Sequence, residues 1–165
     1  MPSYPFTIRN AAREDCPLIL QFIRQLAAYE KLESQVVATL QTLEQSLFEK
    51  KQAEVMIGEE NGIPVAFALF FHNFSTFLGK ANLYLEDLYV QEAYRGRGYG
   101  QAMLQRLAQI AIARDCERLD WWCLDWNTAS IRFYKAMGAD AMTDWTVYRL
   151  QGEQLRRMAE QGSAI

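Results

Sequence analysis

The chain has 165 residues, of which 50% are hydrophobic and 22% are charged, and its formal net charge at pH 7 is −3. This length and composition predict a single globular domain over residues 1–165. The slight negative charge leaves no broad basic surface for nucleic acid, and no apolar stretch is long enough to span a bilayer. The N-terminal MPSYPFTIRN has neither the charged start nor the apolar run of a signal peptide, so we expect a soluble, cytoplasmic protein.

Residues that could bind a metal or form disulfides are few. The chain has three cysteines, Cys16, Cys116 and Cys123, and one histidine, His72. The cysteine count is odd and the spacing is not that of a metal site. We therefore expect reduced, mostly buried thiols and no metal.

Strand and helix patterns alternate in the first fifty residues. Residues 6–8 alternate in the way of a short strand. Apolar residues then recur at helical spacing up to about residue 29, with Asp15 as the expected N-cap and Pro17 in the first turn. Three leucines at positions 40, 43 and 47 predict a second helix.

A β-hairpin is expected next. Apolar runs at residues 54–58 and 63–71 flank the dipeptide Asn61-Gly62. Asn-Gly supplies the two positive φ angles that a two-residue hairpin turn requires, so these runs should form an antiparallel pair.

The segment LYLEDLYV, residues 83–90, is typical of a buried strand, but its apolar pattern is interrupted by Glu86 and Asp87. Burying two adjacent carboxylates is costly unless they are paired or used. The interruption therefore indicates a functional position.

The last third of the chain repeats the α/β alternation. After a glycine-rich loop, a helix is expected to end near residue 115, then a strand over 119–124, a helix capped by Asn127 that stops at Gly138, and a strand over 145–150. The expected apolar face of the first of these helices consists of Leu104, Leu107, Ala108, Ala111 and Ile112. The whole pattern predicts one mixed α/β domain.

The glycine-rich loop is YRGRGYGQ, residues 94–101, with glycines at positions 96, 98 and 100. Glycines let a backbone approach a ligand closely, and the helix behind them offers free N–H groups to a phosphate. A dinucleotide fingerprint would need glycine where Gln101 stands, and a P-loop would need Gly-Lys-Ser/Thr, so neither motif is present. A plain connecting turn is the alternative, but three glycines beside Arg95 and Arg97 exceed what a turn requires.

The sequence RGRGYG in this loop resembles the R-x-x-G-x-G/A pyrophosphate loop of the GNAT acyltransferase superfamily. The resemblance implies acetyl-CoA as co-substrate and a fold with a twisted mixed β-sheet, helices on both faces and splayed central parallel strands. It also implies that the strand before the loop pairs with the pantetheine amides. The expected cofactor-binding residues are Leu88, Tyr89, Val90, Arg95, Gly96, Arg97, Gly98, Tyr99, Gly100, Gln101, Asn127 and Ser130.

Nearly the whole chain is similar to one group within this superfamily. The blocks LAAYEKLESQV, LYLEDLYV, YRGRGYGQ, LDWNTASIRFYKAMGA and QGEQLRRMA resemble those of the spermidine/spermine (diamine) and thialysine N-acetyltransferases. This implies acetyl transfer to a primary amine of a small diamine, polyamine or lysine-like amino acid, with Tyr134 as the general acid, and a homodimer. The expected substrate-binding residues are Tyr29, Glu30, Glu33, Glu86 and Asp87.

Acetyl transfer to an amine requires a neutral nitrogen, a stabilised oxyanion and a protonated leaving sulfur. An amine of pKa ~10.4 is mostly protonated at pH 7. Glu86 is the candidate to take the proton, directly or through a water, because a carboxylate in an apolar strand can have a raised pKa. The alternative is that Glu86 only orients the cation or pairs with an arginine. Carboxylates also favour the ammonium form, so binding and activation of the amine oppose each other.

Three alternatives to direct attack by a small amine stay open. Cys123 could be acetylated first, although no histidine is placed by sequence to activate it. The chain could be a non-catalytic CoA-binding sensor or assembly domain. It could also be a protein-lysine acetyltransferase, which would use the same cofactor loop with a more open amine site.

Overall fold

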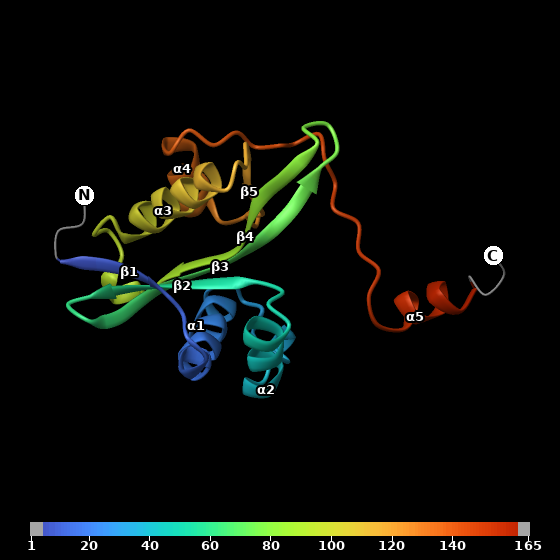
Figure 1. Ribbon diagram of the computed structural model, residues 1–165, viewed down its shortest axis with the longest axis horizontal. Helices are drawn as coiled ribbons and strands as arrows, with labels where there is room; N and C mark the ends of the chain where they lie inside the picture. The colour runs from blue at the N-terminus through green and yellow to red at the C-terminus, as the bar shows by residue number, and fades with distance from the viewer. Residues whose placement is uncertain (1–4, 162–165) are drawn as a thin grey trace. The chain divides into compact units, whose positions relative to one another are not determined.

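The computed structural model describes residues 5–161, and these divide into two compact units at residue 124. Residues 1–4 lie outside the described residues; they belong to the N-terminal stretch from which the cytoplasmic location was expected. The first unit contains β1 (Phe6–Asn10), α1 (Cys16–Tyr29), α2 (Leu40–Glu44), β2 (Glu54–Glu60), β3 (Ile63–Ser75), β4 (Lys80–Val90), α3 (Tyr99–Ala113) and β5 (Leu119–Trp121) (Figure 1). The second contains α4 (Thr128–Ala136) and α5 (Gly152–Gln161).

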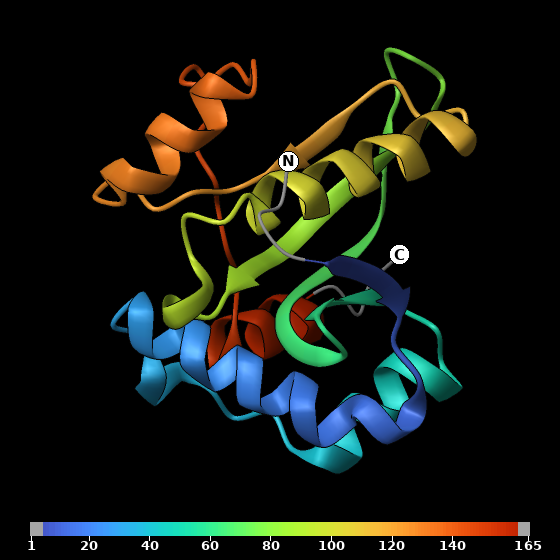
Figure 2. The same ribbon diagram turned by 90° about the vertical axis from the view of Figure 1, so that its left-hand side faces the viewer.

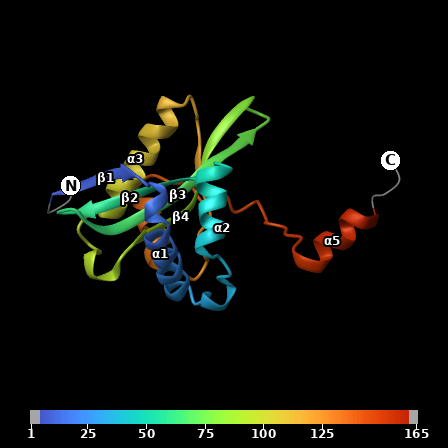
Figure 3. The same ribbon diagram turned by 60° about the horizontal axis from the view of Figure 1, so that its bottom comes forward.

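The first unit is a mixed five-stranded sheet with helices on both faces. The strands lie in chain order; β1 to β4 are antiparallel to their neighbours, and β5 is parallel to β4. α3 covers one face and α1 and α2 the other, as the views in Figures 1 and 2 agree. Figure 3 brings α1 and α2 in front of the strands. The expected α/β sheet architecture is confirmed.

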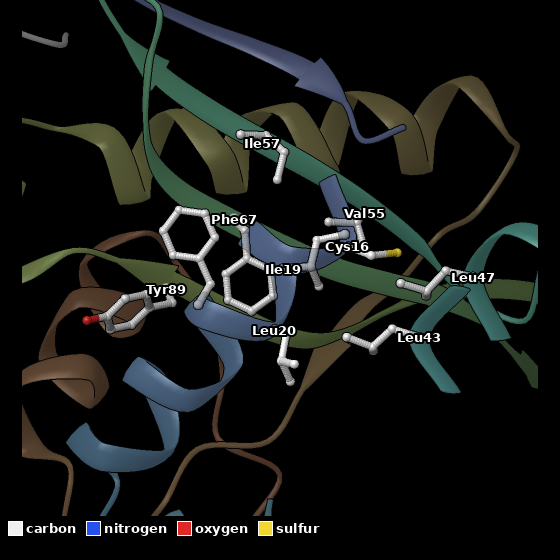
Figure 4. Close-up of a cluster of buried hydrophobic side chains, with 10 residues drawn as sticks. Cys16, Ile19, Leu20, Leu43, Leu47, Val55, Ile57, Phe67 and Tyr89 are labelled. Atoms are coloured by element: carbon white, nitrogen blue, oxygen red, sulfur yellow. The ribbon is translucent and has the colours of Figure 1, made fainter. Parts of the chain in front are cut away.

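The main core lies between the sheet and the α1–α2 side. Figure 4 shows apolar side chains from α1, α2 and three strands packed together there. The rings of Phe22 and Phe67 are stacked at 5.3 Å, and Tyr89 packs on Phe22 at 6.3 Å. The cluster consists of Cys16, Ile19, Leu20, Phe22, Leu43, Leu47, Val55, Ile57, Phe67 and Tyr89. β4 therefore reaches this core through Tyr89.

The opposite face of the sheet carries small residues where α3 packs. Gly58 of β2 is paired with Ala66 of β3, and Met103 of α3 lies directly over Gly58. The expected apolar face of α3 is partly wrong: Leu104, Leu107 and Ala111 are buried, but Ala108 and Ile112 are exposed. The buried side of α3 also includes Tyr99 and Met103, so it lies on a different part of the helix surface from Ala108 and Ile112.

A hairpin turn and a helix match the sequence patterns, whereas an expected N-cap does not. Asn61 and Gly62 have φ of 50° and 78°, so the two-residue hairpin is confirmed. The second helix is confirmed too, since α2 continues as a π-helix over Gln45–Glu49. Asp15 precedes α1, but its side chain does not cap that helix. It accepts instead from the Ala12 N–H at 2.7 Å and from Arg9, whose hydrogen bonds lower the pKa of the Asp15 carboxyl.

The second unit begins with a helix whose two ends are encoded locally. Oδ1 of Asn127 accepts from the Ser130 N–H at 3.2 Å, as expected of an N-cap. At the other end, the N–H groups of Gly138 and Ala139 donate to the carbonyls of Lys135 and Tyr134, with Gly138 at φ 89°. This is a Schellman motif, which requires a residue that tolerates positive φ.

The expected strand over residues 145–150 is wrong, because these residues are in no regular element. A strand is stabilised by a hydrogen-bonded neighbour. Residues 125–161 contain no other strand to serve as one. The helix α5 was not expected from the sequence; its first turn places Glu153 3.2 Å from Arg157.

Gly58 is required by the close packing of α3 and β1. A Cβ at this position would lie 2.5 Å from Cζ of Phe6 and 3.1 Å from Sδ of Met103. The Phe6 ring cannot retreat easily, because it is stacked on Tyr99 at 4.2 Å. Gly58→Ala should lower the free energy of unfolding in urea by about 1–3 kcal/mol. The cost should shrink in a Phe6→Leu background; equal costs in both backgrounds would contradict this origin.

Candidate active site

A β-bulge lies at Glu86 in the middle of β4. Leu69 of β3 faces Asp87, whereas the next residue, Phe70, faces Leu85, so Glu86 has no register partner on β3. A bulge of this kind bends the strand and redirects the side chain at that point. Glu86 is accordingly exposed between the buried Leu85 and the half-buried Asp87.

The sheet opens at the same position. β5 pairs with β4 only at Leu83, Tyr84 and Leu85, and it ends at Trp121 rather than at the expected residue 124. β4 continues to Val90. Within residues 5–161, no strand pairs with the β5-side edge of β4 beyond the bulge. The expected splay of the parallel strands is therefore confirmed and begins beside Glu86.

Two residues of β4 turn their backbone groups toward this open edge. The Gln91 N–H donates to the Val65 carbonyl at 2.9 Å, so residue 91 belongs to a hydrogen-bonded antiparallel pair. Such pairs alternate along a strand. The N–H and C=O groups of Val90 and Leu88 therefore point away from β3, while Tyr89 bonds to β3. Of the three β4 residues expected to contact the cofactor, Leu88 and Val90 have backbone groups that point to this edge, although the Val90 carbonyl accepts a hydrogen bond from Arg95.

The glycine-rich loop follows β4 and leads into α3. Gly96 and Gly98 have φ of 76° and 84°, and Gly98 is the N-cap of the helix. The first backbone bond within α3 is donated by Ala102 to the Gly98 carbonyl at 3.0 Å. The N–H groups of the first turn have no acceptor inside the helix, and they carry the positive end of its dipole. These are the properties of an anion-binding loop.

Arg95 connects the loop to α1 and β4. Its guanidinium lies 4.5 Å from the ring centre of Tyr29 and 5.5 Å from that of Tyr89. Its Nε donates to the Val90 carbonyl at 3.0 Å. The structure thus brings together four predicted site residues, three expected to bind the cofactor and one expected to bind the substrate.

Carboxylates gather beside the bulge. Burial, together with the charges of Glu86 and Glu30, raises the pKa of Asp87 to about 7. Burial also raises the pKa of Glu30, which directly follows α1. Both shifts mean that negative charge is disfavoured at these positions until a cation arrives.

The pKa of Tyr84 is also raised, by burial and by the carboxylates near the bulge. Burial and the charges of Glu86, Asp120 and Asp87 raise the pKa of its hydroxyl to about 12. Its ring lies edge-on to the ring of Trp122, which directly follows β5, with 6.1 Å between the ring centres. Asp120 thus lies near enough to act on Tyr84 together with Glu86 and Asp87, although the sequence pattern did not indicate that residue.

The other predicted site residues are distributed as follows. Glu33 begins a 3-10 turn (Glu33–Gln35) and is exposed. Asn127, Ser130 and Tyr134 lie in the second unit; Ser130 and Tyr134 are on α4, and the Tyr134 ring packs at 5.3 Å from Phe133. All three cysteines are free, two of them buried, and His72 is exposed on β3. The expectation that the thiols are mostly buried is confirmed.

The model of the acetyltransferase (GNAT) family matches residues 19–139. The chain belongs to this family. It is 37% identical to a thialysine N-epsilon-acetyltransferase from Bos taurus over 164 residues, covering 92% of this chain and 96% of the relative. It is also 36% identical to a human spermidine/spermine N(1)-acetyltransferase-like protein over 93% of this chain, which is 24% of that longer protein.

The fold of this GNAT protein is shared with solved structures. An integron cassette protein from the mobile metagenome of V. cholerae superposes with a TM-score of 0.79, at 27% identity, over 94% of this chain and 98% of that one. The chain is thus a GNAT N-acetyltransferase, and acetyl-CoA is the co-substrate of its family. No helix in residues 5–161 has the length and apolar character needed to cross a membrane.

Asp87 should make the stability of the enzyme depend on pH. Its folded-state pKa of about 7 lies above the ordinary value, so the folded protein binds more protons than the unfolded one between about pH 4 and pH 7. Its contribution to stability therefore falls as pH rises through this window and is constant above it. In urea unfolding, Asp87→Asn should match the native chain at pH 4 and be more stable by up to about 3 kcal/mol at pH 8. A difference that does not change with pH would contradict titration of Asp87.

Proposed function

We propose that this enzyme transfers the acetyl group of acetyl-CoA to a primary amine of a small diamine, a polyamine or a lysine-like amino acid such as thialysine. The observation that carries the proposal is the coincidence of the Glu86 bulge with the point where β5 leaves β4. A carboxylate there stands at the mouth of the opening in which a thioester would lie. The 37% identity to a thialysine acetyltransferase supports this substrate class.

The cofactor is proposed to bind along the open edge of β4 and on the glycine loop. Outward N–H and C=O groups of Leu88 and Val90 would pair with the pantetheine amides, as an added strand pairs with a sheet edge. N–H groups of residues 96–101 would hold the pyrophosphate. Arg95 would give up its bond to the Val90 carbonyl, and Asn127 and Ser130 would supply further contacts.

The reaction is proposed to be direct attack in a ternary complex. Glu86 takes a proton from the substrate ammonium, directly or through a water. The neutral nitrogen then attacks the thioester carbonyl, and a backbone N–H near Tyr89 or Val90 stabilises the oxyanion. As the C–S bond breaks, the Tyr134 hydroxyl donates its proton to the sulfur. The second proton that the attacking nitrogen loses restores the Tyr134 hydroxyl, and Glu86 releases the first proton to solvent. Cys123 has no part in this scheme, because direct attack needs no acetyl-cysteine.

A second cationic group on the substrate would resolve the conflict between binding and activation. Distal carboxylates such as Glu30 and Glu33 would hold the second ammonium, so that the reacting nitrogen need not stay protonated for affinity. Asp87, with its pKa of about 7, is half-neutral in the free enzyme and would ionise beside a bound cation. This favours a diamine over a monoamine. We further propose that the whole chain forms one domain and acts as a cytoplasmic homodimer.

Two variants test the assigned chemistry. Tyr134→Phe should lower kcat by about 100-fold, and Glu86→Gln by at least as much, because general acid and base groups contribute about 10²–10⁴-fold. Release of CoA thiol from acetyl-CoA measures kcat, and calorimetry measures the Kd for CoA. Both variants should keep the native Kd; unchanged kcat in either would remove that residue from the mechanism.

The substrate class is tested with a panel of amines. CoA-thiol release should be faster with S-aminoethylcysteine, lysine, putrescine or spermidine than with a matched monoamine such as butylamine, mainly through a lower KM. Glu30→Gln should raise the KM of the preferred diamine about fivefold and leave that of butylamine nearly unchanged. If a lysine peptide outcompetes every free amine, the enzyme is a protein-lysine acetyltransferase instead.

A further inference from the structure

Glu60, at the end of β2, is bound by two side chains of the glycine-rich segment. Its Oε1 lies 2.7 Å from Nη1 of Arg97, and the Tyr99 hydroxyl donates to the same oxygen. The glutamate is 9% exposed. These hydrogen bonds lower the pKa of the Glu60 carboxyl, so the group is ionised and compensated. In the sequence, Glu60 is separated from Arg97 by 37 positions and from Tyr99 by 39.

The other contacts of Arg97 are also with protein groups. Nη2 donates to the Ala93 carbonyl at 3.3 Å, and the guanidinium lies 5.0 Å from the ring centre of Tyr94. Arg97 thus connects the loop to β2 and to the 3-10 turn Glu92–Tyr94 that follows β4. Arg95, two positions earlier, has a different environment between Tyr29 and Tyr89.

The position of this contact matters because of the glycines beside it. Arg97 stands between Gly96 and Gly98, both with positive φ, and such residues have the largest conformational freedom in the unbound chain. Tyr99 is 1% exposed and stacked on Phe6. A loop fastened at Arg97 and Tyr99 loses less entropy when it closes on a ligand.

We propose that Glu60 is a positioning residue, which holds the glycine loop in its cofactor-binding conformation through Arg97 and Tyr99. The inference rests on the proposed binding of CoA by this loop. It assigns the Arg97 side chain to Glu60 rather than to the pyrophosphate, so that the phosphates are held by backbone N–H groups. Arg97 stays on Glu60 when the cofactor binds.

The experiment compares Glu60→Gln with a matched control on the neighbouring residue. Glu59 is also a β2 carboxylate in an ion pair, with Nε of Arg9 at 2.7 Å, but it has no link to the loop. Calorimetry with CoA should show Kd raised about fivefold in Glu60→Gln, since a charge-assisted bond is replaced by a neutral one. Glu59→Gln should keep the native Kd even if both variants lose similar stability on heating.

Steady-state kinetics separate positioning from general damage. In Glu60→Gln the KM for acetyl-CoA should rise with the Kd, whereas kcat and the KM for the amine should stay near their native values. Tyr99→Phe, which removes one of the two bonds, should move Kd in the same direction by a smaller factor. Loss of kcat in Glu60→Gln, with Kd unchanged, would overturn the proposal.

The sharpest alternative is that Arg97 is a phosphate ligand that Glu60 restrains. Glu60→Gln would then bind CoA as tightly as the native chain or more tightly, and this outcome overturns the proposal. In the proposed arrangement, Arg97→Gln and the double variant Glu60→Gln/Arg97→Gln should have the same Kd, and additive effects would contradict it. If the native chain itself fails to bind CoA, the proposed function of the loop is wrong, and this result is separate from any effect of Glu60.

Discussion

The arrangement of the site depends on one residue of β4 that has no partner in the ladder. Glu86 is inserted between the pairs made by Leu85 and Asp87, and β5 accompanies only the part of β4 that precedes it. A regular strand would have kept β5 alongside and would have buried or exposed the two carboxylates in strict alternation. In this structure Glu86 is exposed, Asp87 is half-buried, and the edge of β4 at Leu88 and Val90 has no neighbouring strand among residues 5–161.

The same bulge brings carboxylates close together, and a cationic substrate would reduce their mutual repulsion. Placing Glu86 next to Asp87 near Glu30 raises the pKa of the most enclosed carboxyl by burial and by like charge. The folded enzyme therefore holds unfavourable charge at the opening at neutral pH. In the proposed function, a dication would relieve this repulsion on binding, so that the distal carboxylates bind one ammonium while the reacting nitrogen loses its proton. The expected pH dependence of stability and the proposed preference for diamines would then have one origin.

The parts of the fold that the sequence predicted well are those that a few neighbouring residues specify. Asn61-Gly62 adopts the positive φ angles that its chemistry indicates, and Gly138 ends α4 in the same way. The prediction over residues 145–150 failed because a strand needs a partner, which no local pattern supplies. The face of α3 was misread because alanines and Ile112 make its exposed side apolar as well. Glu86 and Asp87 could be noticed as an interruption, but the bulge appears only in the register against β3.

The contact between Glu60 and Arg97 illustrates the limit most clearly. In the sequence, an arginine within a phosphate-type glycine loop indicates a phosphate ligand, whereas Glu60 is one of two adjacent acidic residues before a hairpin turn. Only the β2–β3 hairpin and the packing of α3 over Gly58 bring the two together. The two arginines of the loop then face different neighbours: Arg95 lies against the tyrosines near the acidic opening, and Arg97 lies against β2. A cation fastened by a protein carboxylate loses much of its value for a phosphate but makes the surrounding backbone rigid, and a rigid backbone is what N–H groups need in order to bind one.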